Sequence, residues 1–241
     1  MRILVLSDIH ANLTALDAVL ASVGSVDAIW QLGDVVGYGP EPDAVVGRLR
    51  DLGATGVRGN HDAAALGGAE IEYFNVDARR AVEWTRTRLA PETRRWLADL
   101  PDRQTNGAFT LVHGSPRDPT WEYLSTTTEA QANLDVLDTP HCLYGHTHLP
   151  LVFRAAEDGQ IETIVPTDGR LVQLDERRIL ANPGSVGQPR DGDPRASALI
   201  LDLASGTLRW HRVAYDIALT QAAMRAQHLP ERLVDRLVRG H

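Results

Sequence analysis

Two histidines separated by one residue, His146 and His148, follow an apolar run that ends at Gly145. In an extended backbone, residues two apart point to the same side, with about 6–7 Å between their Cα atoms. Two imidazoles so placed can each hold a different metal ion, with the ions about 3.5–4 Å apart. A pair of this kind taken alone is more simply explained as a chance surface feature. The pair therefore needs support from the rest of the chain.

That support comes from polar residues in the same kind of position elsewhere. Short apolar runs end at further Asp, Asn or His residues, often beside a glycine: Asp8, His10, Asp34, Asn60, His61 and His113. Five of the nine histidines in the chain share this context. Any one of them could be structural, but five in the same context indicate a common site.

The elements that carry these residues form a repeating pattern. Strands are predicted over 3–6, 28–32 and 56–58, with helices over 13–20 and 42–52 between them. Strand–helix–strand repeats are typical of a parallel sheet. In open α/β sheets, ligands bind at the carboxyl ends of the strands, which is where the polar residues fall.

The rest of the chain favours a second sheet. We expect a helical insertion at about 63–106, strands at 109–112 and 142–144, and antiparallel strands beyond His148. A hairpin is predicted over 197–203 and 207–213, followed by two short helices. The simplest fold is an α/β, four-layer α-β-β-α sandwich of two mixed sheets, with residues 1–241 as one domain.

Composition limits the classes of function. The net charge is -8, and no basic cluster of the kind that binds nucleic acid occurs. No run of about 18 apolar residues predicts a membrane span. The first residues enter a strand directly rather than a signal peptide, so we expect a cytoplasmic protein. The single cysteine, Cys142, is expected to be a buried apolar residue.

Mixed imidazole and carboxylate ligands suit first-row transition ions such as Mn, Fe, Co, Ni or Zn, whereas an all-oxygen set would favour Mg or Ca. A two-metal site lowers the pKa of a bridging water from about 15.7 to about 7 and stabilises both the attacking and the leaving oxygen. This chemistry suits in-line attack on phosphorus. A carboxylate between the ions would hold the pair together, and Asp34 is the candidate.

The motifs Asp-x-His, Gly-Asp, Gly-Asn-His-Asp, His-Gly and Gly-His-x-His occur in this order between Asp8 and His148. Together they resemble the calcineurin-like metallophosphoesterases. The segment 182–185, Asn-Pro-Gly-Ser, also resembles the small bacterial and archaeal phosphodiesterase branch of that superfamily.

The resemblance implies a ligand set for each of two ions. The first ion would be held by Asp8, His10, Asp34 and His148. The second would be held by Asp34, Asn60, His113 and His146, with Asp34 bridging. His61 would contact phosphate and give a proton to the leaving oxygen. Asp62 would orient His61, although a helix-starting cap explains Asp62 equally well.

One departure from the superfamily is informative. Protein phosphatases and symmetrical dinucleoside tetraphosphatases carry an arginine after the Gly-Asp motif, but residues 35–39 contain none. This weakens both interpretations. Asn12, Tyr38 and Arg190 are candidate substrate contacts, for which a helix cap, loop packing and a solvated surface are the simpler explanations.

We therefore expect a phosphodiesterase that uses two divalent transition-metal ions, with Mn as the first choice and Fe, Zn, Co or Ni as alternatives. Hydrolysis would proceed by in-line attack of a metal-bridging hydroxide on a small phosphorylated substrate. A phosphomonoesterase or nucleotide pyrophosphatase on the same site is one alternative. A non-catalytic scaffold of the retromer-subunit type is another, and a nuclease is a lesser one. The sequence leaves the physiological substrate and the oligomeric state open.

Overall fold

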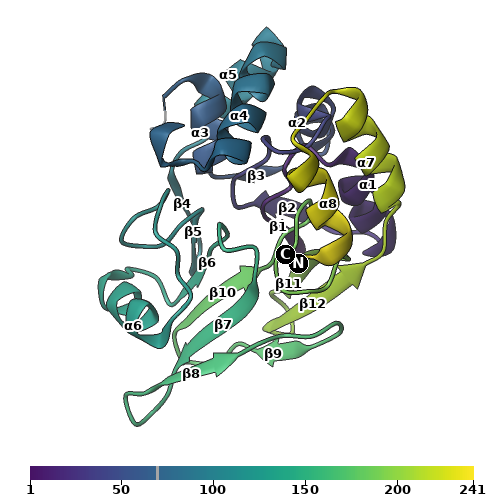
Figure 1. Cartoon of the computed structure of the whole chain (residues 1–241). Helices are drawn as coiled ribbons and strands as arrows, with labels where there is room; N and C mark the ends of the chain where they lie inside the picture. Colours follow the sequence, from purple (N-terminus) through teal and green to yellow (C-terminus); the bar gives the residue numbers. More distant parts are fainter. Residues whose placement is uncertain (69–70) are drawn as a thin grey trace.

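A computed structural model describes residues 1–68 and 71–241 of the chain (Figure 1). Within these residues, twelve strands form two six-stranded sheets. The first sheet has the order β3 (Thr55–Gly56), β2 (Ala28–Gln31), β1 (Arg2–Leu6), β11 (Ala196–Asp202), β12 (Thr207–Val213) and β9 (Leu171–Gln173). The second has the order β4 (Arg103–Asn106), β5 (Phe109–Val112), β6 (His141–Leu143), β10 (Ile179–Pro183), β7 (Pro150–Ala155) and β8 (Ile161–Ile164).

Both sheets are mixed, as expected. In the first, β1 and β2 are parallel, as are β2 and β3, while β11 runs antiparallel to β1. In the second, β5, β6 and β10 are parallel, and β7 runs antiparallel to β10. The carboxyl ends of the parallel strands in each sheet therefore lie at one edge, from which the polar residues project.

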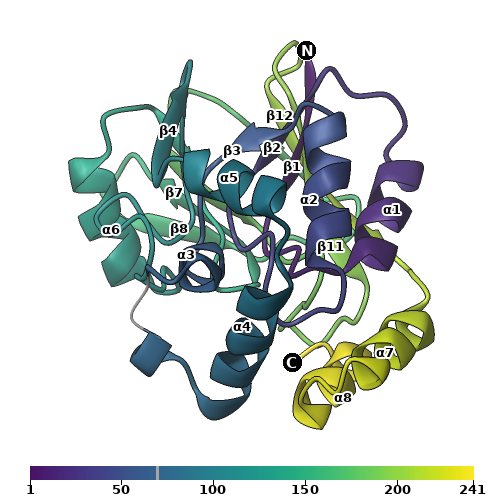
Figure 2. The ribbon, with the colours of Figure 1, turned by 90° about the horizontal axis from the view of Figure 1, so that it is seen from above.

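Helices cover the outer faces of both sheets (Figure 2). The helical elements are α1 (Leu13–Ser22), α2 (Pro42–Asp51), α3 (Asn60–Leu66), η1 (Ile71–Tyr73), α4 (Val76–Arg88), α5 (Pro91–Asp99), α6 (Thr127–Val136), α7 (Ile217–Ala226) and α8 (Glu231–Arg239). Helices α1 and α2 pack on the first sheet, and α6 packs on the second. The four-layer α-β-β-α prediction is confirmed.

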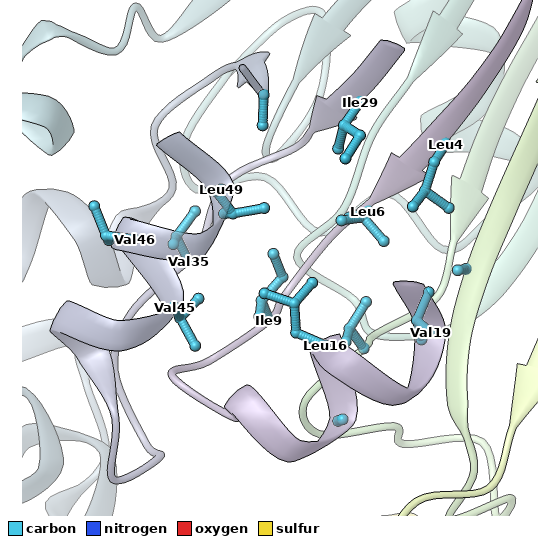
Figure 3. Close-up of a cluster of buried hydrophobic side chains, with 14 of the residues drawn as sticks. Leu4, Leu6, Ile9, Leu16, Val19, Ile29, Val35, Val45, Val46 and Leu49 are labelled. Atoms are coloured by element: carbon cyan, nitrogen blue, oxygen red, sulfur yellow. The ribbon is translucent and has the colours of Figure 1, made fainter. Parts of the chain in front are cut away.

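Strand β1 shows why its sequence is apolar at every position. Leu4 and Leu6 point into the cluster beneath α1 and α2, which Figure 3 shows with Leu16 and Val19. Ile3 and Val5, on the opposite face, pack between the two sheets. Successive side chains of a strand point to opposite faces, so a strand covered on both sides needs apolar residues throughout. Each such side chain, once buried, contributes about 1.5–3 kcal/mol.

The predicted helical insertion is only partly correct. Helices α3, α4 and α5 and the turn η1 lie together at one end of the sandwich (Figure 1), but the segment 103–106 is strand β4. Within the described part of the chain, this strand is an edge strand and pairs only with β5. Its residues, Arg-Gln-Thr-Asn, carry no apolar alternation, which is why the sequence pattern missed it. Residues 69 and 70 of the insertion lie outside the described residues.

The interior between the sheets receives side chains from both, including Trp30 of the first and Phe109 of the second. That the whole chain forms one domain stays a prediction. Among the described helices, none is both long enough and apolar enough to cross a bilayer.

Candidate metal centre

The seven predicted metal ligands lie together at the junction of the two sheets, and all are buried. One group able to hold a cation consists of Asp8, His10, Asp34 and His148. A second consists of Asp34, His113 and His146. Asn60 joins the second group, because its Oδ1 lies 2.9 Å from the Nε2 atom of His113. The groups are those that the resemblance implies, and Asp34 belongs to both.

In the first group, the Nε2 atoms of His10 and His148 are 3.2 Å apart. Asp8 Oδ1 lies 3.3 Å from His148 Nε2, and Asp34 Oδ2 lies 3.6 Å from His10 Nε2. Ligand atoms that share an ion at about 2.1 Å lie about 3.0–3.4 Å apart in octahedral or tetrahedral arrangements. The spacing therefore suits a transition-metal ion.

The second group has similar dimensions. The Nε2 atom of His113 is 3.1 Å from Nδ1 of His146 and 3.4 Å from Asp34 Oδ2. The same carboxylate oxygen, Asp34 Oδ2, thus faces a histidine of each group. Its other oxygen accepts a hydrogen bond from the His61 amide at 2.8 Å. Asp34 is positioned as a bridging carboxylate.

Backbone carbonyls orient three of the histidines. Nδ1 of His10 donates to Val36 O at 3.2 Å, and Nδ1 of His113 donates to Leu32 O at 2.8 Å. Nδ1 of His148 donates to the carbonyl of residue 188 at 2.6 Å. A carbonyl can only accept, so Nδ1 carries a proton in each ring, and Nε2 faces the site and can give its lone pair to a cation.

This arrangement fits a cation better than it fits an empty polar cluster. Two imidazole lone pairs 3.2 Å apart repel each other unless a cation or a proton lies between them. Asp8 Oδ2 accepts from Ser7 Oγ and the His146 amide, but its Oδ1 is buried without a hydrogen-bond partner in the described chain. Buried carboxylates are normally paired or bound to metal. The donor set therefore fits two metal ions.

The backbone at five of the seven predicted ligands is in a left-handed conformation. Positive φ angles of 50–64° occur at Asp8, His10, Asp34, His146 and His148. This conformation costs a non-glycine residue about 1–2 kcal/mol, and such strain is typical of functional sites. The assumption that His146 and His148 continue an extended strand is wrong, because β6 ends at Leu143 and the chain turns. The two rings nevertheless enter different groups, as expected.

Two glycines permit the close approach of the loops. A Cβ atom on Gly59 would lie 2.1 Å from Asp34 Oδ1, and one on Gly145 would lie 2.0 Å from Ser7 Oγ. Both distances are far below van der Waals contact. Any larger residue at these positions would clash with its neighbours, so the Gly-Asn-His-Asp and Gly-His-x-His motifs both need their first glycine.

The electrostatics of the site match the same arrangement. Burial opposes ionisation of Asp34, but the charges of His113, His61 and His10 outweigh it and hold the pKa of Asp34 well below its usual value. Burial opposes protonation of His113, yet Asp34 and Asp8 raise its pKa to about 9. The His113 proton thus balances a buried carboxylate, and a bound cation would displace it.

His61 stands beside the ligands but belongs to neither group. It lines a pocket with Asp34, Asn60, His146 and His148. Burial, with a contribution from positive groups nearby, lowers the pKa of His61 to about 4. Its Nδ1 is buried and has no hydrogen-bond partner in the described chain. The ring is therefore neutral at pH 7.

Asp62 contacts backbone rather than the His61 ring. Its carboxylate accepts hydrogen bonds from the amides of Gly59 and Val36, each at 3.0 Å. The first of these bonds caps the start of α3, the helix that carries His61. The geometry agrees with the alternative explanation, in which Asp62 is a helix cap. Any effect on His61 would pass through the helix.

The three candidate substrate contacts divide into two kinds. Asn12 caps α1 through Ala15 N at 3.1 Å and also bonds Thr220 Oγ1 and Gly187 O. Its polar atoms are engaged within the protein, as the cap explanation predicts. Tyr38 and Arg190 instead line the pocket with His61. The interpretation of Arg190 as solvated surface is thus wrong.

The segment Asn182–Ser185 holds the ligand loops, a function that the sequence analysis missed. Asn182 Nδ2 donates to Gly145 O at 2.7 Å and to Thr147 Oγ1 at 3.1 Å. Ser185 Oγ donates to Asp8 O at 2.8 Å. This segment therefore ties the turn of the double histidine to the first ligand loop. Its available signal was a Pro-Gly pair directly after an apolar strand.

Known proteins resemble this chain over most of its length. Residues 1–206 match the family model of the calcineurin-like phosphoesterase superfamily domain. A crystal structure of a metallophosphoesterase from Sphaerobacter thermophilus is 48% identical and superimposes with a TM-score of 0.92, with both chains covered completely. An uncharacterized protein of Methanocaldococcus jannaschii is 36% identical over 99% of this chain and 98% of its own. The phosphodiesterase YfcE of Escherichia coli is 27% identical over 83% of this chain and 87% of its own.

We expect Asp34→Asn to abolish binding of at least one of two Mn²⁺ ions. Asparagine keeps the size of the side chain and can keep the hydrogen bond from the His61 amide, but its NH₂ group cannot bind a cation. Metal content, measured on protein purified without chelator and loaded with Mn²⁺, is the test. Asp51→Asn, at the exposed end of α2, is the control. Unchanged stoichiometry in Asp34→Asn would contradict the bridging assignment.

Mn²⁺ should also stabilise the fold. A cation that binds only the folded chain adds about 2.7 kcal/mol at 100 times its Kd. For a chain of this length, that corresponds to a rise in Tm of roughly 5–10 °C. Thermal unfolding after chelation and after addition of Mn²⁺ measures the shift. A Tm that does not respond to Mn²⁺ would argue that the clustered ligands hold no ion.

Asn182→Asp should weaken metal binding without touching a ligand. A carboxylate would place an oxygen against Gly145 O, where an NH₂ group now donates. Loss of contacts that orient ligands typically lowers metal affinity by about 10–100-fold. Titration with Mn²⁺ measures the change, and Asn106→Asp on β4 is the control. Equal affinities in the two variants would show that the segment does not position the ligands.

Proposed function

The chain belongs to the calcineurin-like phosphoesterase superfamily, and on this basis we propose that it is a dinuclear-metal-dependent phosphodiesterase acting on a small phosphorylated substrate in the cytoplasm. The observation that carries the proposal is the pair of ligand groups that share one oxygen of Asp34. The likeness to the Escherichia coli phosphodiesterase supports a diester as substrate.

Mn is the first choice of metal, with Fe, Zn, Co or Ni as alternatives, because the ligands combine imidazole with carboxylate. When bound, two such ions supply a water-derived nucleophile at neutral pH and neutralise charge on the phosphoryl oxygens. The protein's contribution is to fix the ligands. The carbonyls behind His10, His113 and His148 hold each ring in one tautomer.

His61 is proposed to donate a proton to the leaving oxygen. Its ring is neutral in the free site, because burial lowers its pKa to about 4. A phosphate anion in the pocket would raise that pKa, since an opposite charge nearby favours the protonated imidazole. His61 would thus become protonated when the substrate binds, and would then donate this proton to the leaving oxygen. The hydrogen bond that the His61 backbone amide donates to Asp34 Oδ1 keeps His61 at a fixed position relative to the ligands.

Two arginines make the surroundings of the pocket favourable for an anion, despite the net charge of -8. Arg190 lines the pocket and donates to Tyr38 OH at 3.4 Å. Arg190 and Arg236, the latter from α8, both donate to the side-chain oxygen of Gln188. Among the described residues, no Asp or Glu carboxylate lies within 4 Å of either guanidinium, although Nε of Arg236 donates to the main-chain oxygen of His241 at 3.2 Å. The charge of Arg190, which lines the pocket, is thus available to a phosphate.

The same site could serve a phosphomonoesterase or a nucleotide pyrophosphatase, and a panel of monoesters, diesters and anhydrides separates these from the proposal. A non-catalytic scaffold has less support. Such a protein needs neither the complete ligand set nor a buried His61 with an unpartnered Nδ1.

The activity test is hydrolysis of bis-(p-nitrophenyl) phosphate by the Mn²⁺-loaded protein. His61→Ala should lower turnover by about 10²–10⁴-fold, the usual contribution of a general acid. Its Mn²⁺ content should equal that of the unmodified protein, because His61 is not a ligand. Turnover no higher than that of His61→Ala would sink the proposed activity, and loss of metal in His61→Ala would show that His61 has a structural role.

A further inference from the structure

Aromatic rings line one side of the pocket beside the ligand groups. The chain contains only five tryptophans, five tyrosines and three phenylalanines, or 5% of its residues. Five of them line this single pocket: Tyr38, Tyr73, Phe74, Trp121 and Tyr123. So high a local concentration requires an explanation, either by packing or by binding.

Packing accounts for Tyr38 and Phe74, and in part for Trp121, whose ring centroid lies 5.5 Å from that of Phe74. Tyr38 and Phe74 are buried, and their ring centroids lie 4.3 and 4.7 Å from that of His61. Both also belong to the apolar cluster between the insertion and the C-terminal helices. Their role is to hold the His61 imidazole in place.

Packing does not account for Tyr73 and Tyr123, whose exposed fractions are 70% and 54%. Tyr73 contacts Trp121 edge to face, with 5.7 Å between ring centroids. Tyr123 stacks on His146 at 4.0 Å and 27°. One face of the Tyr123 ring is thus covered by a proposed metal ligand, while more than half of the residue remains open to a ligand.

The size of the pocket places most of any substrate at these exposed rings. The cavity holds about 70 Å³, enough for a small group such as a phosphoryl group. Whatever is esterified to that group must extend to the mouth of the pocket. Tyr73, Trp121 and Tyr123 offer planar apolar surface with polar edges there, which suits a planar, partly polar group.

We propose that Tyr73, Trp121 and Tyr123 bind the nucleobase of a nucleotide whose phosphate lies at the metal centre. The inference rests on the proposed function for the position of the phosphate, but base stacking itself needs no catalysis. Every base has a flat π face, and stacking on an aromatic side chain strengthens binding by roughly tenfold. The Arg190 charge beside the same pocket would attract the phosphate.

The test compares two probes that share a phosphate and differ in the base: adenosine 5′-monophosphate and ribose 5-phosphate. Binding is measured by calorimetry on Mn²⁺-loaded full-length His61→Gln protein, in which turnover is slowed. We expect adenosine 5′-monophosphate to bind about tenfold more tightly. Tyr73→Ala and Tyr123→Ala should each reduce this ratio toward one and leave the affinity for ribose 5-phosphate unchanged.

Tyr123→Phe is the matched control, because it keeps the stacking ring and should keep the preference. Leu171→Ala, an exposed apolar residue on β9, controls for surface substitution in general. Mn²⁺ content is measured in each variant, since Tyr123 contacts a proposed ligand. If the Mn²⁺ content is constant, a change in the ratio of the two affinities reports on binding of the base alone.

Equal affinities for the two probes, or a preference that survives both alanine substitutions, would overturn the nucleobase site. So would the failure of adenosine 5′-monophosphate to bind at millimolar concentration. If bis-(p-nitrophenyl) phosphate is not hydrolysed but the preference exists and depends on the tyrosines, the proposed function fails and the base site stands. If bis-(p-nitrophenyl) phosphate is hydrolysed but the two probes bind with equal affinity, the proposed function stands and the base site fails.

Discussion

The structure depends on the cost of burying carboxylates and imidazole lone pairs within about 3.5 Å of one another. Asp8 Oδ1 has no hydrogen-bond partner in the described chain, and two histidine nitrogens face each other at 3.2 Å. Such an arrangement is unfavourable in an apolar interior unless cations compensate it. Asp34 and Asp8 raise the pKa of His113 to about 9, so a proton on this ring can supply part of that compensation. The repulsion between these buried lone pairs would therefore be relieved when metal binds.

The surrounding loops must be rigid enough to maintain this arrangement. Each ligand loop is hydrogen-bonded to another: the Asp8 amide to Gly33 O at 3.1 Å, and the Gly145 amide to His113 O at 2.8 Å. These bonds join neighbouring strand ends within each sheet, while Ser185 and the His146 amide connect the loops across the sheets. Residues in left-handed backbone conformations persist only where their surroundings over-determine them. The cross-links between loops meet this condition.

Much of the ligand set could be predicted because its signal is local. A short apolar run followed by Asp or His marks a strand end, and parallel strands bring such ends to one edge of a sheet. The turn at His146 could not be predicted, since its positive φ depends on the Asp8 carboxylate bonding its amide from far along the chain. Strand β4 was missed because an edge strand can be polar. The contacts of Asn182 and the exposure of Tyr73 exist only after the sheets and the insertion have packed.

The positions that would hold metal differ from the positions that would determine substrate specificity. The proposed ligands lie one to five residues after the end of a strand, or at the first residue of α3. The exposed rings instead come from η1 and from the loop after β5, and Arg236 comes from α8. That helix lies beyond residue 206, where the family match ends. Because Tyr73, Trp121, Tyr123 and Arg236 are not ligands, these positions can differ between relatives without loss of the metal centre. Substrate selection in this chain should therefore be governed by η1, the loop after β5 and the C-terminal helices rather than by the sheets.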